Sequence, residues 1–133
     1  MRIDKITTEL INAVKQNEYF NDINVIAAYP KGKKPTRLER ICIAFGISEV
    51  NISSAYIDEH ERTGTVTVFA DIFVPLKYDC GIMPVIFSKM CESLSGFNIL
   101  SITAGRISTD SDIQAYLLKA AVTVGDIITF GGD

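Results

Sequence analysis

The stretch TVTVFADIFVPLK, residues Thr65–Lys77, alternates with a period of two and decides the fold. One set of alternate positions is entirely aliphatic: Val66, Val68, Ala70, Ile72, Val74 and Leu76. This alternation is typical of a β-strand with one face on a hydrophobic core. The other set includes Phe69, Asp71 and Phe73, although a strand face in contact with water is normally polar. The pattern therefore predicts a strand whose second face also needs a partner.

Two segments have the periodicity of amphipathic helices. IDKITTELINAVKQ places its apolar residues at three- and four-residue steps, and IMPVIFSKMCESL does so further along the chain. We expect helices over residues 4–17 and 82–95, both on one face of a sheet. The aliphatic residues of the opening stretch should point at them, namely Val66, Val68, Ile72 and Val74.

The other elements are predicted to be strands. Their expected ranges are 23–29, 37–47, 50–57, 98–107 and 113–124, with a short extra strand at IITF, residues 127–130. Within the fifth range, QAYLLKAA also has helical propensity, but the turn before it and VTVGDIITF after it favour a strand. Strands joined by short turns imply antiparallel pairing. The predicted class is α+β, a mostly antiparallel sheet with two α-helices on one face, in a single domain over residues 1–133.

Composition narrows the function classes. The net charge is −3, so the chain as a whole is not a polyanion binder, and no apolar run approaches the roughly 20 residues of a membrane helix. Cys42, Cys80 and Cys91 are an odd number of cysteines without C-x-x-C spacing, which favours reduced thiols in an intracellular compartment over a disulfide. The first ten residues, MRIDKITTEL, contain no continuous apolar run, so we do not expect a secretion signal in them.

No motif for catalysis or nucleotide binding is present: the sequence has no G-x-S-x-G, P-loop or G-x-G-x-x-G. The lone histidine, His60, could ligate a metal with Asp58 or Glu61, but the favoured interpretation is a solvated turn residue. We expect no catalytic residues, no cofactor and no metal.

Three further acidic residues have two interpretations each. Asp110 and Asp112 in STDSD could belong to a calcium loop, but EF-hand positions are missing, and a hairpin turn is favoured. Asp71 could be a buried acid with a raised pKa, although a structural pairing is favoured.

Basic residues are concentrated in one loop. Five of the 13 fall within ten positions: Lys31, Lys33, Lys34, Arg37 and Arg40. The prolines and glycine of Pro30–Pro35 predict a projecting hairpin tip. Such a cluster could contact nucleic-acid phosphates, but only Tyr29 is nearby to stack on bases, and a solvated hairpin tip is the favoured interpretation. We expect this loop to face a partner.

The second apolar face of Thr65–Lys77 favours self-association or docking into a larger assembly. Two helices cannot cover both faces of the sheet, and a contiguous apolar patch usually marks an interface. Phe69 and Phe73 would enter one neighbouring patch together, and Asp71 would add a polar pairing across the contact.

The order of these elements resembles the tail terminator proteins of long-tailed bacteriophages and phage-tail-like bacteriocins. The likeness is carried by IDKITTELINAVKQ, by TGTVTVFADIFVPLKYDCG before IMPVIFSKMCESL, and by NILSITAGRI and IQAYLLKAAVTV. It implies a homo-hexameric ring that caps the tail tube, stops its polymerisation and meets tube, sheath or neck proteins, with DNA at most in the lumen. The alternatives are another tail, neck or baseplate component, or a small nucleic-acid-binding α+β domain using the basic loop.

Overall fold

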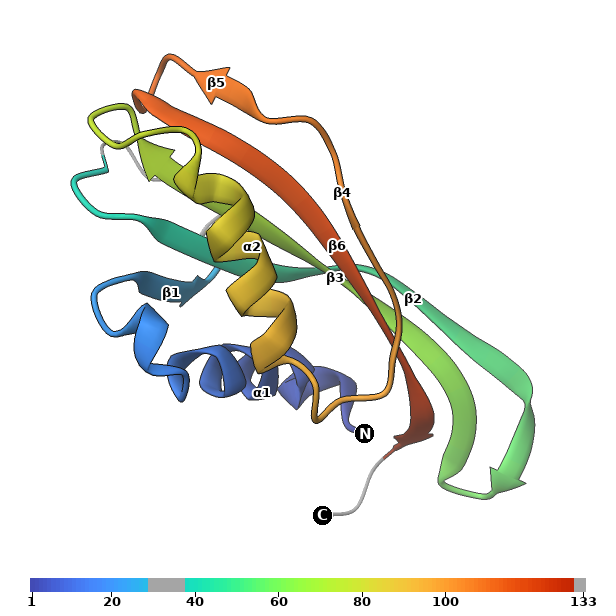
Figure 1. The fold of residues 1–133 in the computed structure, drawn as a ribbon. Coiled ribbons are helices and arrows are strands. Elements are labelled where there is room, and N and C mark those ends of the chain that lie inside the picture. Colours follow the sequence, from blue (N-terminus) through green and yellow to red (C-terminus); the bar gives the residue numbers. More distant parts are fainter. Residues whose placement is uncertain (29–37, 131–133) are drawn as a thin grey trace.

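The computed structural model of this chain describes residues 1–28 and 38–130 (Figure 1). In chain order its elements are α1 (Ile3–Lys15), the 3-10 helix η1 (Glu18–Phe20), β1 (Asn24–Ala27), β2 (Cys42–Asp58), β3 (Glu61–Pro75), α2 (Ile82–Ser93), β4 (Ile99–Ala104), β5 (Ser108–Asp110) and β6 (Ala115–Thr129).

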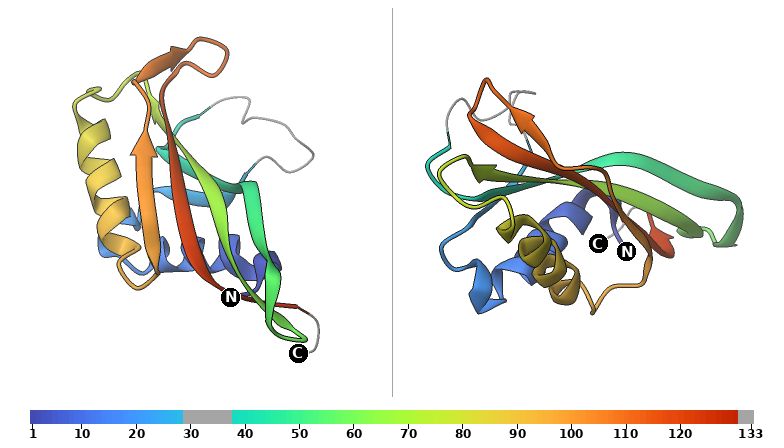
Figure 2. Two further views of the ribbon diagram at one scale, coloured as in Figure 1. Left: turned by 90° about the vertical axis from the view of Figure 1, so that its right-hand side faces the viewer. Right: turned by 45° about the horizontal axis from the view of Figure 1, so that its top comes forward.

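The strands form one sheet in the order β1-β2-β3-β6-β4, with β5 paired to β6. All pairings are antiparallel except that of β1 with β2. Both helices lie on the same side of this sheet, as Figure 2 shows in its right-hand view. The predicted α+β class is confirmed. None of the helices in the described residues is long and apolar enough to cross a membrane.

The main core lies between the helices and the sheet. The alternation of β3 sets its composition, because Val66, Val68, Ile72 and Val74 point toward the helices as expected, and none of them is exposed. The helices contribute the apolar residues of their inner faces: Ile6, Leu10, Ile11 and Val14 from α1, with Met83, Ile86 and Met90 from α2. Burial of each such side chain stabilises the fold by roughly 1.5–3 kcal/mol.

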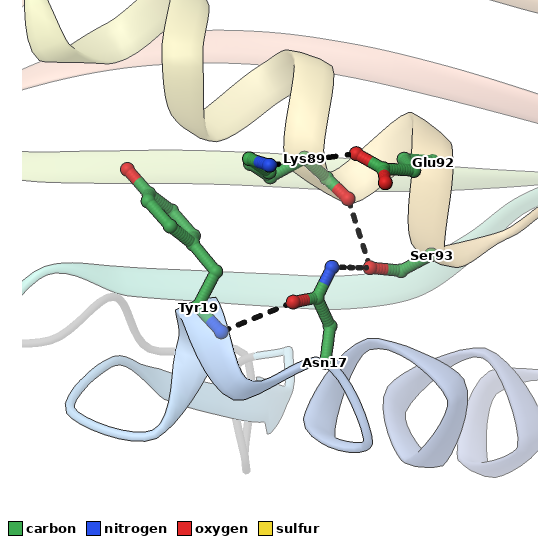
Figure 3. A network of polar contacts seen from close by, with 5 residues as sticks. All are labelled: Asn17, Tyr19, Lys89, Glu92 and Ser93. Carbon is green, nitrogen blue, oxygen red and sulfur yellow. Dashed lines mark hydrogen bonds and ion pairs between the residues drawn. The ribbon is translucent and has the colours of Figure 1, made fainter.

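Polar contacts also join the two helices (Figure 3). The Asn17 side chain accepts a hydrogen bond from the Tyr19 backbone N–H at 3.0 Å, which starts η1, and its Nδ2 donates to Ser93 Oγ at 3.0 Å. Ser93 Oγ in turn donates to the Lys89 carbonyl, 2.8 Å away. The start of η1, directly after α1, is therefore fixed to the end of α2.

Two strand boundaries differ from the prediction. Residues 37–47 and 50–57 were expected to be separate strands, but β2 is continuous from Cys42 to Asp58. The expected break is a β-bulge at Ser48, since the register with β3 shifts between Ile47 and Glu49. The predicted strand at 113–124 is confirmed as β6, which continues to Thr129 and so absorbs the short extra strand.

A second, smaller core lies on the face of the sheet that the helices do not cover. Its buried members come from β2, β3 and β6 and from the residue that leads into β6: Cys42, Ala44, Phe73, Ile113, Ala115 and Leu117. Leu38, just before β2, packs against them. Segments at one end of the sheet therefore cover part of the face that was expected to be free.

Candidate functional site

The hairpin turn between β2 and β3 contains the only histidine of the chain. The His60 backbone N–H donates to Asp58 Oδ1 at 2.7 Å, and its imidazole Nε2 lies 3.2 Å from Glu59 Oε1 in solvent. These contacts fit a turn residue. Across residues 1–28 and 38–130, no three His, Cys, Asp or Glu side chains come together as a metal site would need.

The same turn brings two carboxyl groups together. The hydrogen bond from the His60 backbone N–H lowers the pKa of Asp58, and the Asp58–Glu61 side-chain hydrogen bond lowers it further. For Glu61, the hydrogen bond to Asp58 and the charge of that neighbour raise the pKa. The end of the hairpin is therefore an exposed acidic cluster in which Glu61 holds its proton more readily than Asp58.

Two of the three residues predicted to form an interface are buried within the chain. Phe73 is 1% exposed and belongs to the second core, and Asp71 is 8% exposed. The expectation that Phe73 enters a neighbouring subunit is therefore wrong for this structure, because residues distant in sequence, Leu38 and Ile113, pack around it.

Phe69 is half-buried, and its ring lies over Gly46 on the neighbouring strand. A Cβ at Gly46 would be only 2.5 Å from Phe69 Cζ, so the ring occupies the space that a side chain would fill. Asp71 lies opposite Lys119 in the pairing of β3 with β6. These two residues line a shallow hollow with Phe69, Thr103, Ala120 and Ala121.

The remaining predicted positions are distributed over the molecule. Asp110 ends β5 and Asp112 lies in the turn from β5 to β6, where the Asp112 N–H donates to Asp110 Oδ1 at 3.1 Å. The hairpin interpretation is confirmed, although the first three residues of STDSD belong to a strand. Arg40 is exposed just before β2. The other members of the basic loop, Lys31, Lys33, Lys34 and Arg37, lie outside the described residues, as does the predicted tip Pro30–Pro35.

The cysteines do not form a site. Cys42 is buried in the second core, and burial raises the pKa of its thiol to about 11. Burial also raises the pKa of Cys91. All three thiols are free. Since the thiolate is the reactive form, Cys42 is suited to packing rather than to chemistry.

The most distinctive surface was not predicted from the sequence. We call it the arm and define it as residues 47–58 of β2 with residues 61–67 of β3. The arm extends past both helices (Figure 1). In β2, Cys42–Phe45 is buried, whereas every residue from Ile47 to Asp58 is exposed except the half-buried Ser53. The only signal in the sequence was the mixed polar and apolar content of VNISSAYI, which predicted a weak strand without saying what it faces.

No family model matches the chain, and no curated protein is significantly similar to it in sequence.

Proposed function

We propose that this protein is a tail terminator, a structural protein that caps the end of a phage or phage-like tail tube and stops its polymerisation. It would act as a ring of identical copies, six by the resemblance of the element order. The expected neighbours are the tube protein and a sheath or neck protein. This role needs surfaces for assembly rather than a catalytic centre.

The observation that carries the proposal is the uncovered arm. In the isolated subunit, the twelve consecutive residues 47–58 of β2 are almost all exposed, so they contribute little burial to its own fold. The arm exposes five large hydrophobic side chains, Ile47, Val50, Ile52, Tyr56 and Ile57, each between 36% and 62%. Exposed apolar surface on one contiguous element is typical of a protein that completes its burial in an assembly.

A tube polymerisation assay tests the proposal. Tail tube protein would be polymerised with and without this protein, and tube lengths measured by electron microscopy. We expect substoichiometric amounts to shorten the tubes and to appear as density at one tube end only. Unchanged lengths and bare ends with tube proteins from neighbouring genes would contradict the proposal.

The same material separates the alternatives. Density along the tube or at a baseplate would indicate another tail component. Binding to DNA in the absence of tubes, falling steeply with salt, would indicate a nucleic-acid-binding domain that uses the basic loop.

A further inference from the structure

The outer side of the arm is an open sheet edge. β1 pairs with β2 only over Cys42–Phe45, and beyond Phe45 no strand in the described part of the chain pairs with this side of β2. Residues 47–58 contain neither Lys nor Pro, which commonly protect an edge strand. An unprotected edge of this kind readily pairs with another chain.

The opposite end of the sheet has a second open edge, along β4. This strand pairs with β6 on one side, and none of the described strands pairs with its other side. Leu100 on β4 is 57% exposed, and Ile107, which follows the strand, is 36% exposed. β4 also contains neither Lys nor Pro. Both ends of the sheet therefore present a strand edge with exposed apolar side chains.

The directions of the strands suit these two edges to each other. β3 is antiparallel to β2, β6 is antiparallel to β3, and β4 is antiparallel to β6, so β4 runs opposite to β2. The left-hand view of Figure 2 shows these two strands at opposite margins of the sheet. A second copy in the same orientation would therefore place its β4 antiparallel to the arm, and antiparallel pairing is the more stable kind.

The faces of the strands select one register for this pairing. Ile52 and Ile102 point to the face of the sheet that meets the helices, because their partners on β3 and β6 do. Residues that lie directly opposite each other in an antiparallel pair share a face. Ile52 opposite Ile102 of a second copy keeps the helices of both copies on one side of the continued sheet. The same register puts Asn51 opposite Thr103, on the other face.

Charge favours the same register. Glu49 is the only charged residue among residues 47–57, and Arg106 is the only one among residues 98–107. Both side chains are exposed. With Ile52 opposite Ile102, Glu49 comes beside Arg106 of the second copy. An exposed ion pair adds little affinity, but it favours this contact over pairing of the arm with itself, where both strands are acidic.

We propose that the arm of one copy pairs with β4 of a second copy, so that the sheet continues from subunit to subunit. The inference rests on the proposed function, because it identifies the contact that would build the ring. Each copy uses two different surfaces, its arm and its β4 edge, which is the arrangement that generates rings.

The register also fits a closed ring. Within one copy, Ile102 lies at the level of Ile47 on β2, across β6 and β3. Pairing with Ile52 instead offsets neighbouring copies by about 15 Å along the strands. The strands β2, β3, β6 and β4 together are about 19 Å wide. The strands would then be inclined by roughly 40° to the ring axis, which is typical of closed sheets.

A disulfide cross-link between copies tests the contact directly. One variant carries Asn51→Cys and a second carries Thr103→Cys. Both also carry Cys80→Ser and Cys91→Ser, which remove the two partly exposed native thiols. The mixture would be mildly oxidised over a concentration series and separated on non-reducing gels, after circular dichroism has shown that each variant is folded. In the matched control, Val85→Cys on α2, at a site 47% exposed, replaces Thr103→Cys.

We expect dimers of Asn51→Cys with Thr103→Cys to form at least about tenfold faster than in the control mixture, because paired edges hold the two thiols together. A chain that carries both substitutions should form products longer than a dimer, as a head-to-tail contact requires. Cross-linking at the control rate would overturn the inference. Dimers of Asn51→Cys alone that form as fast as the mixture would also overturn it, since the arm would then pair with itself.

Charge reversal tests the register. Glu49→Arg and Arg106→Glu should each weaken self-association by about two- to fivefold, measured by analytical ultracentrifugation. The variant with both substitutions should regain wild-type association, because the two charges are only exchanged. A double variant that associates no better than the single variants would overturn the pairing of these residues.

These measurements need no tube protein, so the two proposals can fail separately. Cross-linking of the arm to β4 without any effect on tube length would reject the terminator role alone. Tube capping by copies whose edges do not cross-link would reject this contact alone.

Discussion

At the scale of single residues, the contact between Gly46 and Phe69 defines how closely β2 and β3 pack on the face away from the helices. Because a Cβ on Gly46 would be 2.5 Å from the phenylalanine ring and 3.3 Å from Ala28 Cβ, Gly46→Ala must displace the ring. We expect it to lower the free energy of unfolding by about 1–3 kcal/mol, measured by urea denaturation. In a Phe69→Ala background the same substitution should cost less than about 1 kcal/mol. Equal costs in both backgrounds would show that the ring does not occupy this space.

The carboxyl pair in the hairpin turn predicts two separate titrations. Asp58 should titrate below its usual range and Glu61 above it. The contribution of Asp58 to stability is present above its unfolded pKa and is lost as pH falls through its lowered folded pKa. That of Glu61 is present below its unfolded pKa and is lost as pH rises through its raised folded pKa. Carboxyl NMR would measure both.

Glu61→Gln is the control for these titrations. This variant should leave the pKa of Asp58 below its usual range, because the hydrogen bond from the His60 backbone N–H to Asp58 Oδ1, at 2.7 Å, remains. If the pKa of Asp58 returned to its usual range in Glu61→Gln, that hydrogen bond could not be the main cause of the lowered pKa.

At the scale of elements, the second core predicts that Phe73 stabilises the subunit itself. Phe73→Ala should lower the free energy of unfolding by about 3–5 kcal/mol, since the ring is almost fully buried. Ile57→Ser, on the exposed arm, should change it by less than about 0.5 kcal/mol. Thermal and urea unfolding of both variants would measure this. A Phe73→Ala protein of unchanged stability would restore the interpretation of this ring as an interface residue.

The two phenylalanines also show what the sequence could and could not predict. Period-two alternation identified β3 and the face that meets the helices, because side-chain direction in a strand is a local property. Whether Phe73 is covered depends on Leu38 and Ile113, which reach this face only through the tertiary fold. The continuity of β2 was missed for a similar reason: a bulge at Ser48 has the same polar signal as a turn. The exposure of the arm could not be predicted, since its isoleucines are equally typical of a buried strand.

At the scale of the whole molecule, β6 holds the sheet together. It pairs with β3, β4 and β5, and it adds Leu118, Val122 and Ile128 to the main core. A fragment of residues 1–114 should therefore show no cooperative unfolding transition. Adding a peptide of residues 115–133 should restore the sheet, measured by circular dichroism. Cooperative unfolding of the fragment alone, at the wild-type midpoint, would contradict this role.

The position of β6 in the chain has a consequence for synthesis. β3 pairs with residues much later in the sequence, from Pro75 with Ala115 to Glu61 with Thr129. At ribosomal rates of roughly 5–20 residues per second, β3 must wait on the order of seconds for this partner. Such distant pairing also makes folding slow once the chain is complete. The arm needs residues 123–129 of β6 beside it, so a nascent copy cannot complete the arm before residue 129 has left the ribosome. If the proposed role in assembly is right, the order of synthesis would keep copies without β6 from assembling through the arm.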